Sequence, residues 1–340
     1  MKRTLFLFAL LFASFGCSQT RENLSANSVA DTLVVGEWNV ENLFDTIDDP
    51  GKRDEEFTPQ SPKHWTNKRL TKKLNHLARA LNLIKPDIWG FEEVEHKSLI
   101  DSLVKRLKYG EYGIAYAESP DFRGIDNALI FRKDKFRLVS FDTLRVPLPQ
   151  NRTTRYILYV KLKDFAGNDW NVFVNHWPSR WGGKEKSEPK RISAAQTLKK
   201  YLICNNIKEN VIITGDFNDD PSDPSIRYCL SAKKNAEEIF SADDLVNLSA
   251  EKFYNGEGSL NYRGNWNMLD QIIVSQDVIN GDDVRYLSGS FEVVKYDFLV
   301  IQSGKYKGKP DRTYAGKKYI GGYSDHFPVK AKFIVNGANE

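Results

Sequence analysis

Asp216 and Asn218 are the polar residues of this sequence whose types and spacing most clearly suggest chemistry. They follow the largely apolar run at residues 211–214, and Phe217 lies between them. At the end of an extended strand, residues i and i+2 point the same way, so both polar side chains can face one ligand while Phe217 points into the core. Gly215 permits either the close approach of a phosphate or a sharp exit from the strand. A polar turn is the alternative interpretation, because turn-forming residues follow directly.

Polar residues also end two other strand-like runs. Glu93 follows the short run at residues 88–91, and a carboxylate in that position suits a hard divalent cation such as Mg²⁺. Asn39 and Glu41 show the i, i+2 spacing at the end of the first predicted strand, and an asparagine can bind a metal through its oxygen or a phosphate through its NH₂ group. Two further glutamates adjoin Glu93 and leave solvated surface acidity as an alternative: Glu92 and Glu95. An ordinary strand exit is the alternative for Glu41.

One histidine lies at the start of the last predicted strand. His326 follows Asp325, and Asp270 stands directly before another strand. A histidine whose second nitrogen is held by an aspartate has a fixed tautomer and a stabilised cation. The alternative is a structural histidine with satisfied hydrogen bonds.

A second histidine leaves a strand. His176 follows the run at residues 172–175 and enters a loop that contains Arg180, so it is interpreted as part of a phosphate-facing rim. Asp126 could orient His176, and Arg155 could contact phosphate; a simple turn and a solvated charge are the alternatives. The other three histidines are assigned to the surface or to packing: His64, His76 and His96.

Absent motifs narrow the chemistry. The sequence contains no phosphate-binding P-loop, no GxSxG, no HExxH and no dinucleotide GxGxxG. The candidate ligands are rich in oxygen and poor in cysteine and histidine, which favours Mg²⁺, Mn²⁺ or Ca²⁺ over zinc.

The elements that must position these residues alternate between strands and helices early in the chain and are mostly strands in the middle. Leucine and isoleucine at helical spacing predict a helix over residues 70–84, capped by Thr66 and ended by Pro86. Strands are predicted at 32–40, 88–91, 128–131, 156–162, 172–174, 211–214, 272–274 and 329–334, and further helices at 99–107 and 191–203. This mixture predicts two packed sheets with helices outside. No linker divides residues 32–336, so we expect one domain there.

The composition is that of an ordinary soluble protein. The 340 residues are 41% hydrophobic and 28% charged, which allows a large core. Cys204 and Cys229 are predicted to be two buried small hydrophobic residues, with a disulfide as the alternative.

The N-terminus differs in kind from the rest. Lys2 and Arg3 precede an apolar run at residues 5–12, and small residues then lead to Cys17. This pattern predicts a secretory signal at residues 1–16, too short to span a membrane, followed by a tether at residues 17–31. Removal of the signal lowers the formal net charge from +4 to +2, so bulk charge neither requires nor excludes a polyanionic substrate. The Gly16–Cys17 placement resembles a bacterial lipoprotein signal, in which the cysteine is lipidated; plain secretory cleavage is the alternative.

Taken in order, these motifs resemble the endonuclease/exonuclease/phosphatase superfamily. The matching stretches begin at residues 38–40, include Glu93 and His176, continue through residues 215–218 and Leu269–Asp270, and end at residues 324–326. The resemblance covers roughly residues 33–335. It implies a four-layer α/β/β/α sandwich of two packed mixed sheets with helices outside, and a site at one end of both sheets.

The resemblance also implies roles for individual residues. Glu93 is the main Mg²⁺ ligand, with Asn39 and Asp325 as helpers, and Mn²⁺ or Ca²⁺ as other candidate ions. Asp216 orients or deprotonates the attacking water, and Asn218 binds a phosphate oxygen. Asp270 pairs with His326, which protonates or stabilises phosphoryl oxygens, and His176 helps the leaving oxygen. Three residues are assigned to the substrate side of the site: Arg155, Arg180 and Asp126. The spacing around Asp126 departs from the deoxyribonuclease pattern.

Three functions follow as hypotheses. The first is an exported, metal-dependent phosphodiesterase that cleaves nucleic acid, DNA rather than RNA, by in-line attack of water. Four residues near His176 could then stack on bases and hold phosphates: Trp177, Arg180, Trp181 and Lys184. Core packing is the alternative for the two tryptophans. The second is a phospholipid or inositol- or sugar-phosphate hydrolase of the same fold, and the third is a non-catalytic binding lipoprotein. We expect a monomer that is either anchored to the bacterial envelope through lipid alone or secreted.

Overall fold

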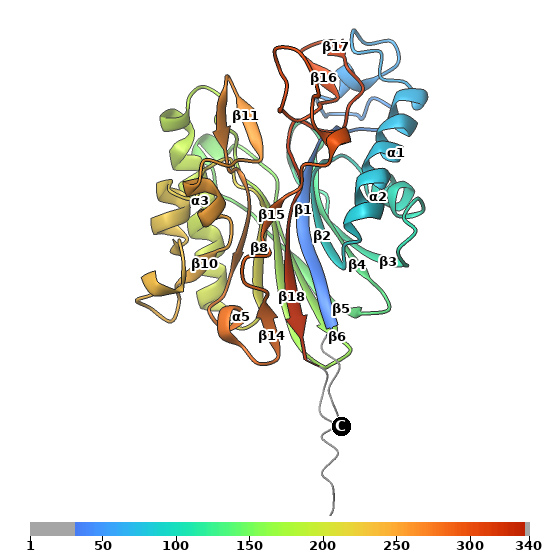
Figure 1. The fold of residues 1–340 in the computed structure, drawn as a ribbon. Coiled ribbons are helices and arrows are strands. Elements are labelled where there is room, and N and C mark those ends of the chain that lie inside the picture. The colour runs from blue at the N-terminus through green and yellow to red at the C-terminus, as the bar shows by residue number, and fades with distance from the viewer. Residues whose placement is uncertain (1–30, 337–340) are drawn as a thin grey trace, which may run out of the picture.

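Two large sheets of mixed strand direction form the centre of the computed structural model, which describes residues 31–336 (Figure 1). In spatial order the first sheet contains β14 (Val284–Tyr286), β18 (Val329–Val335), β1 (Asp31–Leu43), β2 (Ile88–Val94), β4 (Asp126–Arg132) and β3 (Tyr112–Tyr116), with β15 (Glu292–Val293) beside β18. The second contains β5 (Phe136–Leu144), β6 (Ile157–Asp164), β7 (Asp169–His176), β8 (Val211–Asp216), β13 (Asp270–Val274), β10 (Leu245–Asn247) and β9 (Ala232–Lys233).

Alternation along the strands of the second sheet explains its two apolar faces. On β7, Val172 and Val174 pack into the core between the sheets, whereas Phe173 faces the other way and packs with α3 (Lys184–Cys204). Ile212 and Ile213 on β8 divide in the same manner. Successive residues of a strand point to opposite faces, so each continuous apolar run serves both layers.

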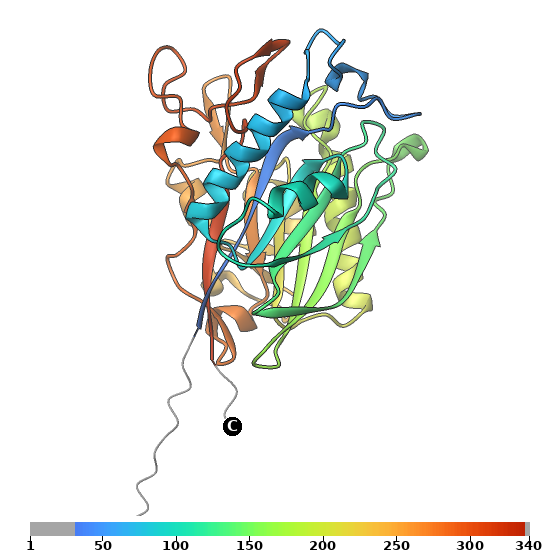
Figure 2. The same ribbon diagram turned by 90° about the vertical axis from the view of Figure 1, so that its right-hand side faces the viewer.

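Helices cover the outer faces of both sheets. α1 (Asn67–Ile84) and α2 (Lys97–Val104) lie across the first sheet, and α3 covers the second (Figures 1 and 2). The short helices are α4 (Ala250–Tyr254) and α5 (Asp277–Asn280), with single helical turns at Glu55–Phe57, Pro149–Asn151, Ser225–Cys229, Ala236–Glu238 and Asp297–Leu299. The predicted four-layer α/β/β/α arrangement is therefore confirmed. None of the helices in residues 31–336 is long and apolar enough to cross a membrane.

The N-terminal cap of α1 matches the prediction. The Thr66 hydroxyl accepts a hydrogen bond from the Arg69 backbone N–H, and α1 ends at Ile84, two residues before Pro86. The prediction for α3 was less accurate, because the helix begins at Lys184 rather than at Arg191. The polar first turns of α3 carry no apolar periodicity, so the sequence pattern revealed only the half that packs on the sheet.

Two expectations about burial are corrected. Cys204 is exposed and Cys229 half-buried, and both are free thiols.

The strand β5 was not predicted, because six consecutive residues from Arg137 to Asp142 are exposed and the segment lacks an apolar run. The predicted signal and lipidation site, and all but the last residue of the predicted tether, lie outside the described residues.

The register of the strands brings the candidate site residues to one end of the two sheets, the upper end in Figure 1. β7 and β8 are parallel and place His176 beside Asp216, while β13 is antiparallel to β8 and places its first residue, Asp270, on the other side of Asp216. In the first sheet, Glu37 of β1 pairs with Val329, so the residues just before β18, including His326, lie beside the late part of β1. β1 starts at the opposite end of the sheets with Asp31, which pairs with Val335.

Candidate active site

The carboxylate of Asp216 is the centre of the candidate site. Its Oδ2 atom accepts a hydrogen bond from Nδ2 of Asn39 at 3.1 Å, which joins the two sheets. The Nε2 atom of His176 lies 3.7 Å from the same oxygen, and that of His326 lies 4.0 Å from it. Asp216 is only 2% exposed. One carboxylate oxygen is thus surrounded by three nitrogen-bearing side chains from three different strand ends.

Asp270 and His326 form a buried pair. The Nδ1 atom of His326 lies 2.7 Å from Oδ2 of Asp270, and the Ser259 hydroxyl donates a hydrogen bond to the same oxygen. Burial lowers the pKa of His326, but the charge and hydrogen bond of Asp270, with further help from Asp216, outweigh that effect and hold the pKa well above its ordinary value. The ring is therefore a cation at neutral pH, with Nε2 turned towards Asp216.

His176 has the opposite electrostatic environment. Burial, together with the positive charges of Arg155 and Arg123, lowers its pKa well below the ordinary value, so the ring is neutral. The expected hydrogen bond from the His176 ring to Asp126 is not formed. Asp126 accepts hydrogen bonds from the Tyr116 hydroxyl and the Ser119 backbone N–H, and Nδ1 of His176 has no hydrogen-bond partner among residues 31–336. The two histidines of the site therefore differ in charge.

Asp216 itself has an unusual acidity. Burial raises its pKa to about 7; the nearby His326 cation lowers it, and Asp270 raises it. A carboxylate with a pKa close to neutrality accepts a proton from water better than an ordinary aspartate does. The arrangement therefore places a carboxylate that can accept a proton beside the His326 cation.

The backbone of the Gly215–Asn218 segment differs from the extended strand end that the sequence predicted. Asn218 has a left-handed backbone (φ 52°), and its N–H donates to Oδ1 of Asp216 at 2.8 Å, so a turn rather than strand alternation joins the two residues. The NH₂ group of Asn218 donates to the backbone carbonyl of Trp177. Only glycine fits at position 215, because the neighbouring strand is too close for a side chain: a Cβ there would lie 2.0 Å from the Asn175 carbonyl oxygen. Phe217 is fully buried, as predicted, and packs edge-on against Trp177.

Glu93 lies at the open side of the site and is the group best suited to a metal. It lies near the end of β2, where the pairing with β4 is irregular; its backbone is left-handed (φ 63°) and its side chain keeps 14% exposure. Its Oε2 accepts the Asn42 N–H, while Oε1 lies 4.0 Å from Nε2 of His176. The oxygens of Glu93, of the Asn39 carboxamide and of Asp325 are of the kind that suits a hard cation such as Mg²⁺. Among the described residues, however, Oδ1 of Asn39 accepts the Glu41 N–H and Asp325 pairs with Arg312. Glu92, the preceding residue, is fully buried and is not solvated surface acidity.

The three remaining predicted polar residues lie around the site with protein partners of their own. Arg155 is buried and contacts Asp121 and the Trp177 carbonyl. Arg180 donates to the Asn218 carbonyl and to two carboxylates of the turn after Asp216, which are those of Asp220 and Asp223. Asp325 accepts a hydrogen bond from Arg312 at 2.9 Å. Arg155 and Arg180 thus brace the loops that carry the site.

Several residues of the site were missed by sequence reasoning. Ser259 holds Asp270, and the N–H groups of Thr313 and Tyr314 hold the carboxylate of Glu41. The guanidinium of Arg123 lies 3.7 Å from Glu93, a contact that the sequence did not indicate. No local signal could reveal these contacts, because each joins segments that are distant in sequence.

Exposed aromatic side chains stand on loops at the same end of the sheets. Trp181 follows β7 and is 87% exposed, whereas the neighbouring Trp177 is buried. Tyr262 is 60% exposed on the hairpin of β11 (Leu260–Tyr262) and β12 (Asn265–Asn267), where Leu260 bridges to His326. Phe122, 52% exposed, precedes β4. These side chains provide flat apolar surfaces at the same end of the sheets as Asp216.

Comparisons with known proteins agree with this geometry. The model of a family described as "Endonuclease/Exonuclease/phosphatase family" matches residues 34–334. A search of curated proteins found no match. Similar solved structures include an endonuclease/exonuclease/phosphatase family protein from Bacteroides thetaiotaomicron, with 17% identity, coverage of 90% of this chain and 96% of that chain, and a TM-score of 0.58.

Two other similar structures carry more specific descriptions. One is TDP2 of D. rerio in complex with a single-strand DNA product, with 15% identity, coverage of 89% and 98%, and a TM-score of 0.55. The other is a mannosyl-6-phosphatase of Bacteroides thetaiotaomicron, with 16% identity, coverage of 88% and 99%, and a TM-score of 0.54. At these identities the likeness concerns the fold.

Proposed function

Because the chain belongs to the endonuclease/exonuclease/phosphatase family, whose fold implies hydrolysis of phosphoric esters, we propose that it is a metal-dependent phosphodiesterase that cleaves nucleic acid, DNA in preference to RNA. The observation that carries the chemistry is the convergence of Asn39, His176 and His326 on one oxygen of Asp216. Hydrolysis of a phosphodiester needs an aligned water, neutralised phosphoryl oxygens and a stabilised leaving oxygen.

The residues divide these tasks by charge. Asp216, with a pKa of about 7, orients the attacking water and takes its proton. The His326 cation, held by Asp270, stabilises negative charge on the phosphoryl oxygens. The neutral His176 donates a hydrogen bond to the leaving oxygen, and Asn218 binds a phosphoryl oxygen. Glu93, Asn39 and Asp325 would hold the Mg²⁺ ion, which supplies further positive charge at the phosphate when bound.

Nucleic acid is favoured as substrate by the aromatic rim. Trp181, Tyr262 and Phe122 are exposed around the site, and the guanidinium of Arg263 lies 5.2 Å from the Tyr262 ring while that of Arg53 lies 5.6 Å from the Phe122 ring. Aromatic rings that stack on bases, combined with cations that meet the backbone, are typical of single-strand binding. The solved TDP2 complex has the same fold and holds a single-strand DNA product.

A sugar-phosphate monoesterase is the second candidate. The burial of the reacting groups favours it, because His176 is 4% exposed and His326 is 7% exposed, and a terminal phosphate reaches such groups more easily than an internal one. A mannosyl-6-phosphatase shares the fold.

Substrate turnover tests both candidates. The purified protein would be incubated with single-stranded DNA, plasmid DNA, RNA, mannose 6-phosphate and an inositol polyphosphate, with Mg²⁺ or with EDTA. We expect Mg²⁺-dependent cleavage of DNA that is lost in Asp216→Asn and His326→Gln and kept in Asp297→Asn, a change at an exposed acid. If only the sugar phosphates are hydrolysed, the nuclease hypothesis is rejected, whereas the proposed hydrolysis of phosphoric esters at this site stands.

The proposal includes export. The N-terminal sequence supports a signal at residues 1–16 and lipidation of Cys17. Since β1 begins at the end of the sheets opposite Asp216, a chain tethered there by lipid would present its site away from the membrane. Incorporation of labelled palmitate in a bacterial host, abolished by Cys17→Ser, tests the anchor; processing without label would indicate plain secretion.

A further inference from the structure

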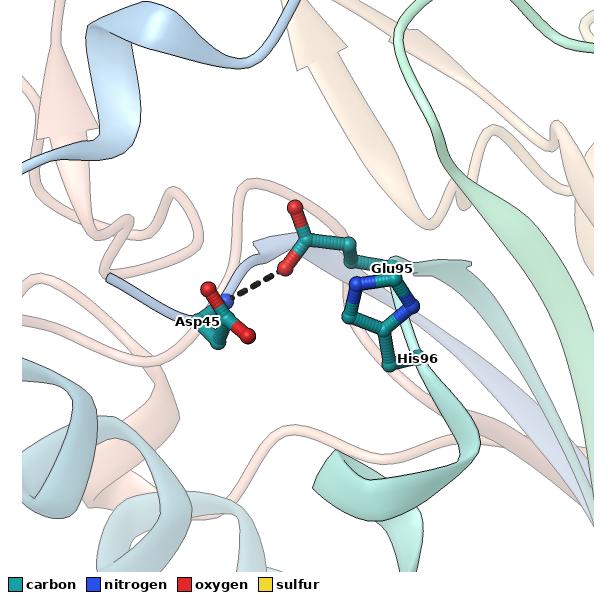
Figure 3. Close-up of side chains that lie close together, drawn as sticks. All are labelled: Asp45, Glu95 and His96. Carbon is teal, nitrogen blue, oxygen red and sulfur yellow. Dashed lines mark hydrogen bonds between the residues drawn. The ribbon is translucent and has the colours of Figure 1, made fainter. Parts of the chain in front are cut away.

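A second group of acidic side chains lies beside the active site and has no role in it. Asp45 follows β1, Glu95 and His96 join β2 to α2, and the three side chains face one another (Figure 3). Asp49 and Asp54, from the loop after β1, extend the group through a second set that also contains Glu95. Within each of the sets Asp45–Glu95–His96 and Asp49–Asp54–Glu95, ligand atoms lie within 4.8 Å of one another. Glu95 is the shared member.

Asp54 distinguishes this group from ordinary surface acidity. It is only 1% exposed, and its Oδ1 atom is buried with no hydrogen-bond partner among residues 31–336. Oδ2 accepts the backbone N–H of Asp49 at 3.0 Å. A buried carboxylate oxygen without a donor is costly unless a cation or another partner meets it.

The negative charge of the group is poorly compensated by the protein. Within residues 31–336, its only basic partner inside 4.0 Å is His96, whose Nε2 lies 2.9 Å from Oδ2 of Asp49. Lys52, in the same loop, instead donates to the backbone carbonyls of Ser119 and Asp121. Glu95 is itself only 2% exposed. Sequence reasoning had allowed Glu95 to be solvated and assigned His96 to the surface or to packing.

We propose that Asp45, Asp49, Asp54 and Glu95 form a calcium site that is separate from the Glu93 site. Calcium accepts many carboxylate oxygens in irregular geometry, which suits carboxylates from a loop and two strand ends that form two overlapping sets around Glu95. His96 then acts by holding the carboxylate of Asp49 in place rather than by binding the ion.

A cation there would fasten the loop between β1 and α1 to the end of β2. Glu93, two residues before Glu95, accepts the N–H of Asn42, three residues before Asp45. The Asp45 N–H in turn donates to Glu95 at 2.6 Å. The two strand ends that present Asn39 and Glu93 to the active site are thus the same ends that the ion would join. The inference does not depend on which phosphoric ester is the substrate.

Calcium binding in a Glu93→Gln background tests the site, because that change removes the main ligand of the other metal position. Isothermal titration of the purified variant with CaCl₂ alone should show one ion per chain. The midpoint of thermal unfolding should rise by about 5 °C at 100-fold excess over the dissociation constant. Adding Asp54→Asn should weaken binding at least tenfold and abolish the thermal shift. Adding Asp48→Asn, at an exposed acid of the same loop outside the group, should leave both unchanged.

Other outcomes would overturn the inference. Absence of calcium binding to the Glu93→Gln protein, or an unchanged response after Asp54→Asn, would show that the acidic group holds no ion. Binding of MnCl₂ without binding of CaCl₂ would reject the oxygen-only assignment and place His96 among the ligands. If Asp54→Asn fails to fold, Asp45→Asn provides the same comparison at a half-buried position, and an unchanged response there would equally contradict the proposal.

Discussion

The Nδ1 atom of His326 lies 2.7 Å from Oδ2 of Asp270, although 56 residues separate them in the sequence. His326 comes from the segment before β18 in the first sheet, and Asp270 begins β13 in the second. The pair therefore joins the two sheets at the active site and fixes which ring nitrogen faces Asp216.

Loss of the Asp270 charge should impair catalysis. In Asp270→Asn the carboxamide cannot stabilise the imidazolium, so the pKa of His326 should fall and kcat should drop by about 10²-fold or more. The ring pKa is measured by NMR titration and kcat with a single-stranded oligonucleotide. Ser259→Ala removes a hydrogen bond to Asp270 but keeps the charge, and should have a much smaller effect. A lowered His326 pKa with unchanged kcat would refute the assigned role.

The activity should show a bell-shaped dependence on pH. The pKa of Asp216 is raised to about 7, and only the ionised carboxylate accepts a proton, so kcat/KM should increase as the pH rises towards 7. The pKa of His326 is raised well above its ordinary value, so the rate should fall again only when the alkaline pH removes its proton. Initial rates between about pH 5 and pH 10 would test this. A rate that decreases from pH 5 to pH 7 would contradict the role of Asp216.

A buried pair of carboxyl groups should make stability depend on pH. Glu37 and Glu92 are fully buried on neighbouring strands, and none of their oxygens has a donor from another described residue. Burial raises the pKa of each well above the ordinary value of 4.5, and mutual repulsion contributes for Glu37. Below 4.5 both groups are protonated in the folded and unfolded states. Stability then declines as the pH rises towards the folded-state pKa, because only the unfolded chain ionises freely.

Glu92→Gln should relieve this effect. The free energy of unfolding at pH 8 should increase by roughly 1–3 kcal/mol, and the difference between pH 5 and pH 8 should shrink. Urea unfolding at the two pH values provides the measurement. Glu111→Gln, at a side chain that is 87% exposed, should change neither value. A loss of stability at pH 8 in Glu92→Gln would mean that the ionised carboxylate is stabilised by a partner.

Trp181 should contribute to nucleic-acid affinity and not to chemistry. The Trp181→Ala change removes one stacking surface, worth about 1–3 kcal/mol per base, so KM for single-stranded DNA should rise about 5- to 100-fold. The kcat for a small chromogenic phosphodiester should stay unchanged. Phe240→Ala is the matched control, because Phe240 is 90% exposed and lies near Asp244, at the other end of the sheets. Equal effects of the two changes would exclude the aromatic rim as a binding surface.

The sequence predicted the strand ends of the site well, because apolar runs followed by single polar residues mark such positions. Glu92 and Glu93 show where this reasoning failed. They are adjacent and chemically identical, yet a left-handed residue at the end of β2 turns Glu93 to the open side and leaves Glu92 between the sheets. Which of the two glutamates is buried depends on the residues of the opposite sheet, and the local sequence pattern contains no information about them. The same holds for Thr313, whose partner Glu41 lies 272 residues away, and for Ser259, which bonds to Asp270, 11 residues further along the chain.

Hydrolysis of a single-stranded oligonucleotide in ¹⁸O-labelled water tests whether Asp216 activates the attacking water. One labelled oxygen should enter each product phosphate in the presence of Mg²⁺, and Asp216→Asn should lower the rate by at least about 10²-fold while binding of the uncleaved oligonucleotide is retained. Label incorporation at an undiminished rate in Asp216→Asn would contradict the account, because the water would then be activated without the carboxylate at the centre of the site.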